Sequence, residues 1–243
     1  MQIVDTGLIL RETPYKEADV MLTILTECRG KISVLARGAR RKGSRFSAAI
    51  QLLTYSEFTL YESSGRYSLN EADPIEMFGE IRKDIVKLSL ASYFAEVLEQ
   101  AADEETINPE LLRLGLNSIY AVANTEISPV KIKAAFELRV AAMSGYLPNV
   151  YRCSSCGSDS DIVSFDIKNG IVFCKECSLK SMRKINSAVV DAMRYIFNTD
   201  IKRIFSFKIN DASMKILSEI ADEYLSFHFD RVFKTNKFYK SLL

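Results

Sequence analysis

Four cysteines constrain this chain more than any other feature of its sequence. Cys153, Cys156, Cys174 and Cys177 form two C-x2-C pairs that are seventeen residues apart. Two residues between cysteines let one tight turn direct both sulfurs at a single point. Two such turns together make a tetrahedral site for a zinc ion about 2.3 Å from each sulfur. Because four thiolates leave no open position for water or substrate, we expect one structural Zn²⁺.

The residues between the two pairs predict a β-hairpin. Residues 162–167 and 171–173 flank Asn169-Gly170, a dipeptide suited to a two-residue turn with positive φ. Gly157, directly after Cys156, lets the chain curl so that backbone N–H groups can point at the thiolates. Two disulfides or a CxxC redox pair are the alternatives. Both are disfavoured, because the chain starts without a secretory pattern and nothing near the cysteines resembles a βαβ unit.

Composition indicates an ordinary folded protein, with 48% hydrophobic and 26% charged residues among 243. No run approaches the roughly 20 apolar residues that a membrane span needs, so we expect no membrane partner and a cytoplasmic location. The fifth cysteine, Cys28, is interpreted as a small strand or turn residue. The net charge of +1 conceals local clusters, and local density sets the field that a polyanion experiences.

The fold class predicted is α+β, with two domains. Residues 1–76 read as five short β-rich segments with hairpin-type turns, and Gly7 is a possible bulge. This pattern predicts a small barrel, for which a five-stranded OB-fold that binds nucleic acid is the first candidate and an SH3-like barrel the alternative. Residues 77–243 read as a helical domain, with the zinc module inserted at about 150–180.

Helical periodicity and capping residues place five segments in the second domain. The first, over residues 78–102, is a helix or a kinked pair. Asn108 and Ser128 each precede a proline and are expected to cap the helices that follow. The remaining expected helices span about 109–122, 129–144, 187–198 and 211–228, the last two capped by Asn186 or Ser187 and by Asn210.

A basic stretch lies between the third and fourth predicted strands. Glycines and a serine keep it pliable and let backbone N–H groups approach phosphates. Its cations, which carry donors matched to phosphate oxygens, are Arg37, Arg40, Arg41, Lys42 and Arg45. We expect them to contact DNA phosphates without reading sequence; the alternative is a solvated charge run. Lys234, Lys237 and Lys240 form a second, C-terminal basic patch.

Barrel aromatics could extend this surface as stacking platforms. Tyr55, Phe58, Tyr61 and Tyr67 lie on adjacent predicted strands. Strand alternation puts Tyr55 and Tyr61 on one face and Phe58 on the other, so some of these rings belong to the core. Catalytic groups are scarce: His228 is the one histidine and is expected to be a packed or capping residue. An enzyme is therefore disfavoured.

The chain resembles the RecO family of bacterial recombination mediators over essentially its full length. The resemblance rests on Asp5-Thr6-Gly7-Leu8-Ile9-Leu10 with Tyr15-Lys16-Glu17-Ala18-Asp19, on Ala36-Arg37-Gly38-Ala39-Arg40-Arg41 through Ser44-Arg45-Phe46, and on Gly145-Tyr146-Leu147-Pro148. It implies an N-terminal OB-fold, a helical domain and, in many members, a four-cysteine zinc module. Some members lack the cysteines, in agreement with a structural role for zinc.

The resemblance also implies a function and partners. These are binding of single- and double-stranded DNA, annealing of complementary strands and, with RecR, assistance in loading RecA onto strands coated by single-stranded DNA-binding protein. It further implies association with the nucleoid during repair. The alternatives are a zinc-stabilised protein-interaction adaptor and a Mg²⁺-dependent nucleic-acid-processing enzyme.

One partner site is expected on the helix over residues 129–144. By resemblance, the helical domain docks the acidic, apolar-ended tail of single-stranded DNA-binding protein, which needs a shallow apolar pocket and cations. The candidate cations are Lys131, Lys133 and Arg139, beside the apolar residues Ile132, Ala135 and Phe136. The alternative is that Ile132 and Phe136 are core residues and the cations are merely solvated.

Overall fold

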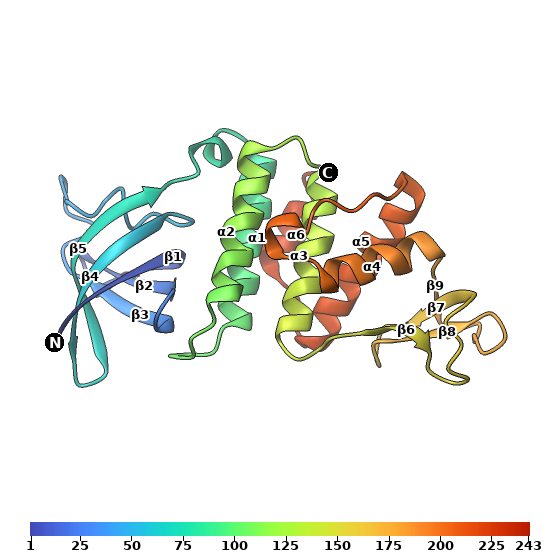
Figure 1. Cartoon of the computed structure of the whole chain (residues 1–243). Coiled ribbons are helices and arrows are strands. Elements are labelled where there is room, and N and C mark those ends of the chain that lie inside the picture. Colours follow the sequence, from blue (N-terminus) through green and yellow to red (C-terminus); the bar gives the residue numbers. More distant parts are fainter. The chain divides into compact units, whose positions relative to one another are not determined.

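The chain folds into two compact units, which Figure 1 shows with their elements labelled. A computed structural model describes all residues, 1–243. Unit 1 consists of Met1–Thr125 and Phe233–Leu243, and unit 2 of Glu126–Val232. Unit 2 is therefore an insertion in the sequence of unit 1.

Unit 1 contains a closed five-stranded barrel. Its strands are β1 (Gln2–Tyr15), β2 (Asp19–Thr26), β3 (Gly30–Ala36), β4 (Tyr55–Ser63) and β5 (Arg66–Glu76). Their order around the barrel is β1-β2-β3-β5-β4, and β1 pairs with β4 to complete the circle. Only β3 and β5 run parallel, with Val34 opposite Tyr67 and Leu35 opposite Ser68. This is the five-stranded Greek-key order of the OB-fold, which confirms the predicted fold class.

Alternation along the strands fills the barrel. Phe58, Leu60, Leu22 and Ile24 are fully buried in one apolar cluster, as expected for inward positions. The predicted bulge at Gly7 was wrong, because the register shift of β1 lies between Ile9 and Arg11. Gly7 serves close approach instead: a Cβ there would lie 2.7 Å from Ile24 Cγ2.

Helices complete unit 1. They are η1 (Gly79–Lys83), α1 (Ile85–Ala101), α2 (Pro109–Asn124) and α6 (Lys234–Lys240). The first expected helix is thus a short 3-10 turn followed by α1, because the Asp84 carboxylate accepts from the Val86 and Lys87 N–H groups and starts a new helix. Asn108 caps α2 as predicted.

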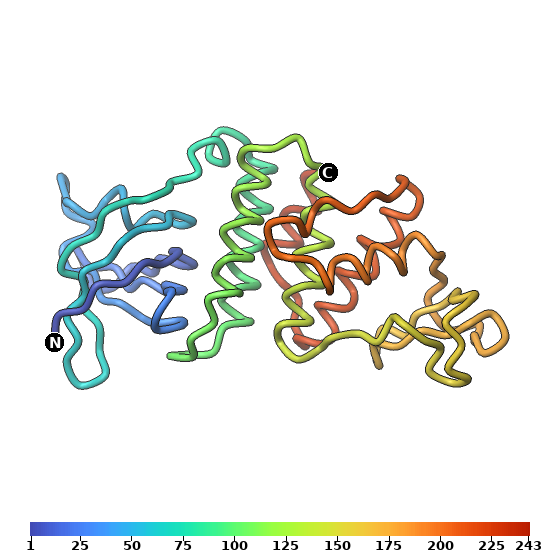
Figure 2. Tube along the Cα trace, viewed as in Figure 1, coloured from blue at the N-terminus to red at the C-terminus, as the bar shows by residue number.

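The C-terminal segment returns to α1, as the red end of the tube in Figure 2 shows. The ring of Phe233 packs edge-on against Tyr93, with centroids 5.6 Å apart. Glu96 Oε2 accepts a hydrogen bond from Thr235 N, at 3.0 Å. The sequence patterns gave no sign of this helix or of its packing.

The helices of unit 1 also contact its barrel. Lys31 Nζ donates to the Glu99 carbonyl at 2.8 Å, and Glu105 N donates to the Lys31 carbonyl at 3.1 Å. Compact unit 1 therefore extends past the domain boundary expected after residue 76. Independent folding of the barrel within that boundary stays a prediction.

Unit 2 combines three long helices with a small sheet. Its elements are α3 (Pro129–Met143), β6 (Asn149–Cys153), β7 (Ile162–Asp166), β8 (Ile171–Cys174), β9 (Arg183–Lys184), α4 (Ser187–Asn198), η2 (Ile201–Arg203) and α5 (Asp211–His228). The strand order is β6-β8-β7-β9. Asn186 and Asn210 cap α4 and α5 as predicted, whereas the Ser128 side chain makes no capping bond to α3.

The predicted hairpin joins β7 to β8, but its turn differs from the expected one. Residues 167–170 form a four-residue loop in which Gly170 has φ 64° and Asn169 is not left-handed. The Asp166 carboxylate accepts from the N–H groups of Lys168 and Asn169, at 2.9 and 3.3 Å. A side chain that caps the turn from its first residue removes the need for two left-handed residues.

Candidate metal centre and basic loop

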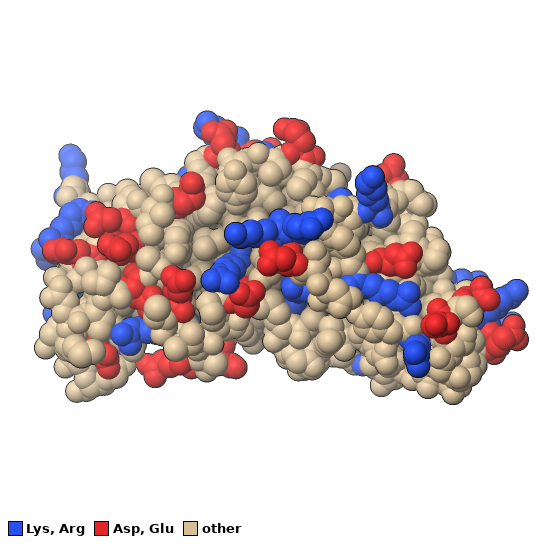
Figure 3. Space-filling view, in the orientation of Figure 1, with Lys and Arg blue, Asp and Glu red and all other residues tan.

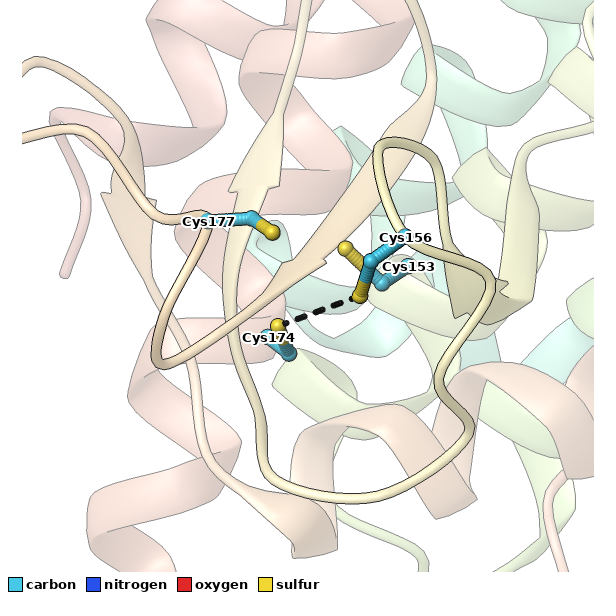
Figure 4. A group of neighbouring side chains, drawn as sticks. All are labelled: Cys153, Cys156, Cys174 and Cys177. Carbon is cyan, nitrogen blue, oxygen red and sulfur yellow. Dashed lines mark hydrogen bonds between the residues drawn. The ribbon is translucent and has the colours of Figure 1, made fainter.

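The four cysteines converge as predicted. Their Sγ atoms all lie within 4.8 Å of one another. Figure 4 shows the side chains of the two C-x2-C pairs pointing toward a common centre. Cys153 and Cys174 end the neighbouring strands β6 and β8, and Cys156 and Cys177 follow in the turns after them. Strand pairing therefore brings two sequence-distant turns together.

Backbone geometry shapes each turn around the sulfurs. Gly157 has φ 77° and its N–H donates to the Cys153 carbonyl, which closes the first turn as expected. The Cys177 N–H donates to the Cys174 carbonyl at 3.2 Å and closes the second. A hydrogen bond from the Cys174 backbone, with smaller help from Cys156 and Ser155, lowers the pKa of Cys153 to about 6. At Cys153, backbone donors thus favour the thiolate form that metals bind, whereas the pKa values of Cys156 and Cys177 are raised without a metal.

The spacing of the sulfurs fits a metal ion. Sulfurs bound tetrahedrally at about 2.3 Å from a zinc ion lie about 3.8 Å apart, and Cys156 Sγ and Cys174 Sγ are separated by 3.7 Å. All five cysteines are unbridged, so the structure has no disulfide. Each C-x2-C pair begins at the last residue of a strand and continues into a turn. A CxxC redox pair typically lies at the start of a helix instead. The cluster can hold a metal ion with a complete shell of four sulfurs.

The basic loop, residues 37–45, leaves the barrel between β3 and β4. Ala39 and, directly after the loop, Phe46 insert into the barrel core and are each 8% exposed. Asp19 Oδ1 accepts from the Gly38 N–H at 2.7 Å, and the Ala18 carbonyl accepts from the Arg40 N–H at 2.9 Å. The backbone of this loop is consequently tied to the barrel, although its side chains are long and charged.

All five predicted cations of the basic loop are exposed. Arg37, Arg41 and Lys42 have no ion pair or side-chain hydrogen bond. Arg45 donates to the Asn70 carbonyl at 2.6 Å, and Arg40 makes only a 3.5 Å contact with the Glu17 carbonyl. Figure 3 shows Lys and Arg side chains at the barrel end from which this loop projects, next to Asp and Glu side chains of the barrel. The loop thus presents unneutralised cations on an anchored backbone, the arrangement that phosphate contacts require.

The barrel aromatics divide as the alternation predicts. Phe58 is fully buried, whereas Tyr61, three residues along β4, is 55% exposed. Tyr55 is half-buried and its hydroxyl donates to Thr6 Oγ1 at 3.0 Å. Tyr67 packs partly against the barrel core, and burial raises its pKa. Of the four rings, only Tyr61 is available as an open stacking surface.

The three cations expected to bind a partner tail have structural partners within unit 2. Arg139 donates to the carbonyls of Ile196, Phe197 and Thr199 at 2.6–2.8 Å, where α4 ends. Lys131 Nζ donates to the Phe207 carbonyl and lies 4.6 Å from the centre of the Phe207 ring. Helix C-termini attract cations because their last carbonyls lack intrahelical partners.

Lys133 is buried in an ion-paired group between α3 and α5. Its Nζ lies 2.5 Å from Glu137 Oε1 and 2.8 Å from Asp222 Oδ1. Burial by itself lowers the pKa of Lys133, but the two carboxylates outweigh burial and raise it. Ile132 and Phe136, which were expected beside the cations in an apolar pocket, are fully buried core residues of a helix enclosed on all sides. The cations are paired, in contrast to the solvated alternative. Partner binding through them stays a prediction.

The remaining candidates are the histidine and the C-terminal lysines. His228 stacks among aromatic rings, 4.2 Å from the Tyr224 centroid, and its Nε2 lies 3.2 Å from the Ile167 carbonyl. Lys234, Lys237 and Lys240, the second basic patch, lie exposed on α6, and DNA binding by them stays a prediction. Asp19 is a residue that pattern reasoning missed as an anchor of the basic loop, although it lies in the first block of family resemblance.

No helix combines the length and apolar composition needed to cross a bilayer.

Comparisons with known proteins agree on one family. The family models described as Recombination protein O N terminal and C terminal match residues 1–78 and 82–237. The DNA repair protein RecO of Acetivibrio thermocellus is 34% identical over 98% of this chain and 96% of its own length. That of Alkaliphilus metalliredigens is 34% identical over 96% of both chains, and that of Halalkalibacterium halodurans 30% identical over 91% and 89%.

Proposed function

Because the chain belongs to the RecO family of DNA repair proteins, we propose that it is a non-catalytic recombination mediator that binds DNA through its basic loop. In this proposal it binds single- and double-stranded DNA and anneals complementary strands. With RecR it helps to load RecA onto strands coated by single-stranded DNA-binding protein. Its place of action is the cytoplasm, at the nucleoid during repair.

The observation that carries this proposal is the contrast between backbone and side chains in the basic loop. The backbone is tied down by Asp19 and Ala18, so a strand meets a surface that is already ordered. Arg37, Arg41 and Lys42 keep all their donors for the strand. Phosphate contacts of this kind release counterions, so affinity falls with salt and does not depend on base sequence.

A charge-matched comparison tests the DNA site. The loop variant carries Arg37→Ala, Arg41→Ala and Lys42→Ala. The control carries Lys202→Ala, Lys208→Ala and Lys215→Ala, three exposed lysines of unit 2. The loop variant should weaken binding to unrelated oligonucleotides equally and flatten the log–log salt slope by about 0.7 per lost contact on single strands. A slope unchanged in the loop variant, or equally changed in the control, would locate the site elsewhere.

The mediator role has its own test. Complementary strands coated with their binding protein are mixed with the chain, and annealing is followed by fluorescence. Annealing by the wild-type chain that slows in the loop variant is the expected result. Binding to acidic proteins with no annealing would instead favour the adaptor function. Metal-dependent breakdown of the strand would indicate an enzyme.

We further propose that the metal held by the four cysteines is a single structural Zn²⁺. When bound, zinc contributes folding energy to the module, since a structural site of this type is not formed in the unfolded chain. Cys153, Cys156, Cys174 and Cys177 would be its ligands. Metal analysis should find one zinc per chain. Cys174→Ala should lose it and unfold the module around residues 150–184, while the barrel strands keep their slow amide exchange.

The tail of single-stranded DNA-binding protein is proposed to dock on unit 2, as the family resemblance implies. Because Lys133 and Arg139 hold unit 2 together, substituting them would confuse binding with stability. Lys131 is a better probe, since its ammonium makes one hydrogen bond at the edge of the helix. Affinity of Lys131→Ala for a tail peptide, compared with Lys208→Ala, tests whether this face contributes. Equal affinity of both variants and the wild type would place the pocket on another surface.

A further inference from the structure

A groove runs between the cysteine module and helix α5, both in unit 2. One wall is formed by β7 and the turn after it, with Ile167 and Lys168, and another by the segment after Cys177, with Leu179 and Met182. Phe227 and Glu223 of α5 complete it. Its volume is about 680 Å³, within the range of pockets that bind ligands. Neither the zinc site nor the basic loop uses these side chains.

Apolar groups in the groove are unusually open to solvent. Leu179 is 62% exposed and Phe227 is 48% exposed. The Phe227 ring stands edge-on to His228, with an interplanar angle of 89° and centroids 5.2 Å apart. His228 is itself held between Tyr224 and the Ile167 carbonyl. Phe227 therefore stands at the edge of an aromatic cluster, with part of its surface free to contact a planar group.

The groove is lined by two cations, Lys168 and Arg183, and by two acids, Asp166 and Glu223, and the chain around it is rich in further cations. Residues 168–184 contain five cations and one acid, Glu176. The cations are Lys168, Lys175, Lys180, Arg183 and Lys184. Arg183 is paired with Glu219, whereas the four lysines are exposed and have no salt bridge. Lys168 lines one wall, and exposed Lys180 stands between Leu179 and Ser181 of the other, so a chain of negative charges lying along the groove would have a cation near each side.

The groups of the groove offer contacts for a base as well as for phosphates. Asp166 and Glu223 line the groove and repel any anion beside them, so phosphates are expected at the lysines of its rim. Glu223 can accept a hydrogen bond from the amino group of a base, as carboxylates do from cytosine, which an acidic peptide side chain does not offer. A ring for stacking, a carboxylate for a base edge and lysines at the rim form the set that single-strand binders combine. Bases paired in a duplex do not expose the faces that Phe227 would contact.

We propose that this groove is a second binding site for single-stranded nucleic acid, in which Phe227 stacks on a base and Lys168 and Lys180 bind phosphates. The inference rests on the proposed annealing function, and it supplies what that function needs. A protein that joins two complementary strands must hold both. The basic loop binds one strand and the groove binds the other.

The test separates the two sites by combining variants of the full chain. The groove variant carries Phe227→Leu, Lys168→Ala and Lys180→Ala, and it is studied alone and together with the loop variant described above. The probe is a fluorescein-labelled oligothymidylate, which cannot pair with itself. The groove variant should bind it about five-fold or more weakly at the groove, because a stacking contact is lost. Its salt slope should fall by about 1.4 for two phosphates. Annealing should slow in either variant and cease in the combination.

Single substitutions identify the chemistry. Phe227→Tyr keeps a ring and should retain the affinity of the wild type, whereas Phe227→Leu keeps apolar surface without a ring and should not. Lys202→Ala with Lys208→Ala is the charge control and should bind normally. The side chains changed are exposed, so the thermal midpoint and the metal content should equal those of the wild type.

Three outcomes would overturn the inference. The first is a groove variant that binds and anneals like the wild type while the loop variant fails; the proposed function would then survive on the loop alone. The second is equal binding by Phe227→Leu and Phe227→Tyr. The third is an oligoaspartate peptide ending in phenylalanine that binds the groove more tightly than the oligonucleotide, which would make the groove a peptide site. If the groove variant loses binding and annealing while the loop variant behaves like the wild type, the groove proposal stands and the proposed DNA site in the basic loop is wrong.

Discussion

Two groups of cations in this protein look similar in sequence and have opposite surroundings. In unit 1 the basic loop ties its backbone to the barrel and leaves Arg37, Arg41 and Lys42 in solvent. In unit 2 helix α3 directs Lys133 into the interior and Arg139 onto the end of α4. The first group is available to a ligand, and the second is consumed in holding unit 2 together.

The difference shows that a cation's role depends on what its backbone packs against. Ala39 and Phe46 are the apolar anchors of the basic loop, and the long side chains near them point away from the core. Helix α3 is surrounded by neighbouring segments. A lysine in the middle of this helix is therefore buried, and a buried ammonium group needs carboxylates beside it. Stability and DNA binding should therefore respond in opposite ways to substitutions in the two groups.

The largest effect on stability is expected at Lys133. Lys133→Met should lower the free energy of unfolding by about 3–5 kcal/mol, because it leaves buried Glu137 without its cation. Denaturant unfolding of unit 2 measures the loss. The double variant Lys133→Met with Glu137→Met removes both buried charges and should recover most of it. Equal losses in the single and double variants would show that packing, not charge, makes Lys133 necessary.

The same ion group has a defined dependence on pH. Because the pKa of Lys133 is raised above its ordinary value of 10.5, its contribution to stability is complete below the ordinary value. The contribution is lost as pH rises through the raised pKa. In the double variant, this loss of stability at alkaline pH should be smaller than in the wild type. An identical alkaline profile in both proteins would contradict the assignment.

A smaller loss is expected at Arg139. Arg139→Ala removes donors from three carbonyls at the end of α4 and should cost about 1.5–3 kcal/mol of unfolding free energy. Arg139→Lys keeps the charge but lacks the planar fork, so its loss should be intermediate. Oligonucleotide affinity should stay unchanged in both variants. If Arg139→Ala has the thermal midpoint of the wild type, water replaces the guanidinium as the hydrogen-bond donor to the three carbonyls.

The smallest effects on stability belong to the basic loop. Arg45→Ala should cost about 0.5 kcal/mol, because its bond to the Asn70 carbonyl is exposed. Arg41→Ala should cost less, since Arg41 has no such bond. Both should weaken DNA binding, and their thermal midpoints should differ little from that of the wild type. A loop variant that unfolds as readily as Lys133→Met would remove the distinction between the two groups.

Local patterns predicted much of the fold because the forces involved are local. Strand alternation correctly separated buried Phe58 from exposed Tyr61. Asn108, Asn186 and Asn210 cap helices, as their positions before apolar-periodic segments indicated. Ser128 makes no capping bond in an equivalent sequence context, so residue type alone does not decide capping.

Errors arose where a contact with another residue overrides the local preference. Gly7 was expected to form a bulge, but Ile24 of the adjacent strand approaches it too closely for any Cβ. Asn169 was expected to be left-handed, and the carboxylate of Asp166 made another turn possible. The groove between the cysteine module and α5 could not be foreseen, because Lys168, Leu179 and Phe227 come from three separate segments.

The sequence by itself determined the four-cysteine cluster, the five-stranded barrel and the existence of an exposed basic loop. Each depends on spacing, on alternation or on residues within a few positions of one another, and those relations survive in any fold that the segments join. Only the tertiary structure decided which cations remain in solvent, where the C-terminal helix packs and which side chains meet in the groove. Burial, the carbonyls that Arg139 contacts and the Asp222 carboxylate come from segments far away in the chain, so charge along the sequence could not reveal them.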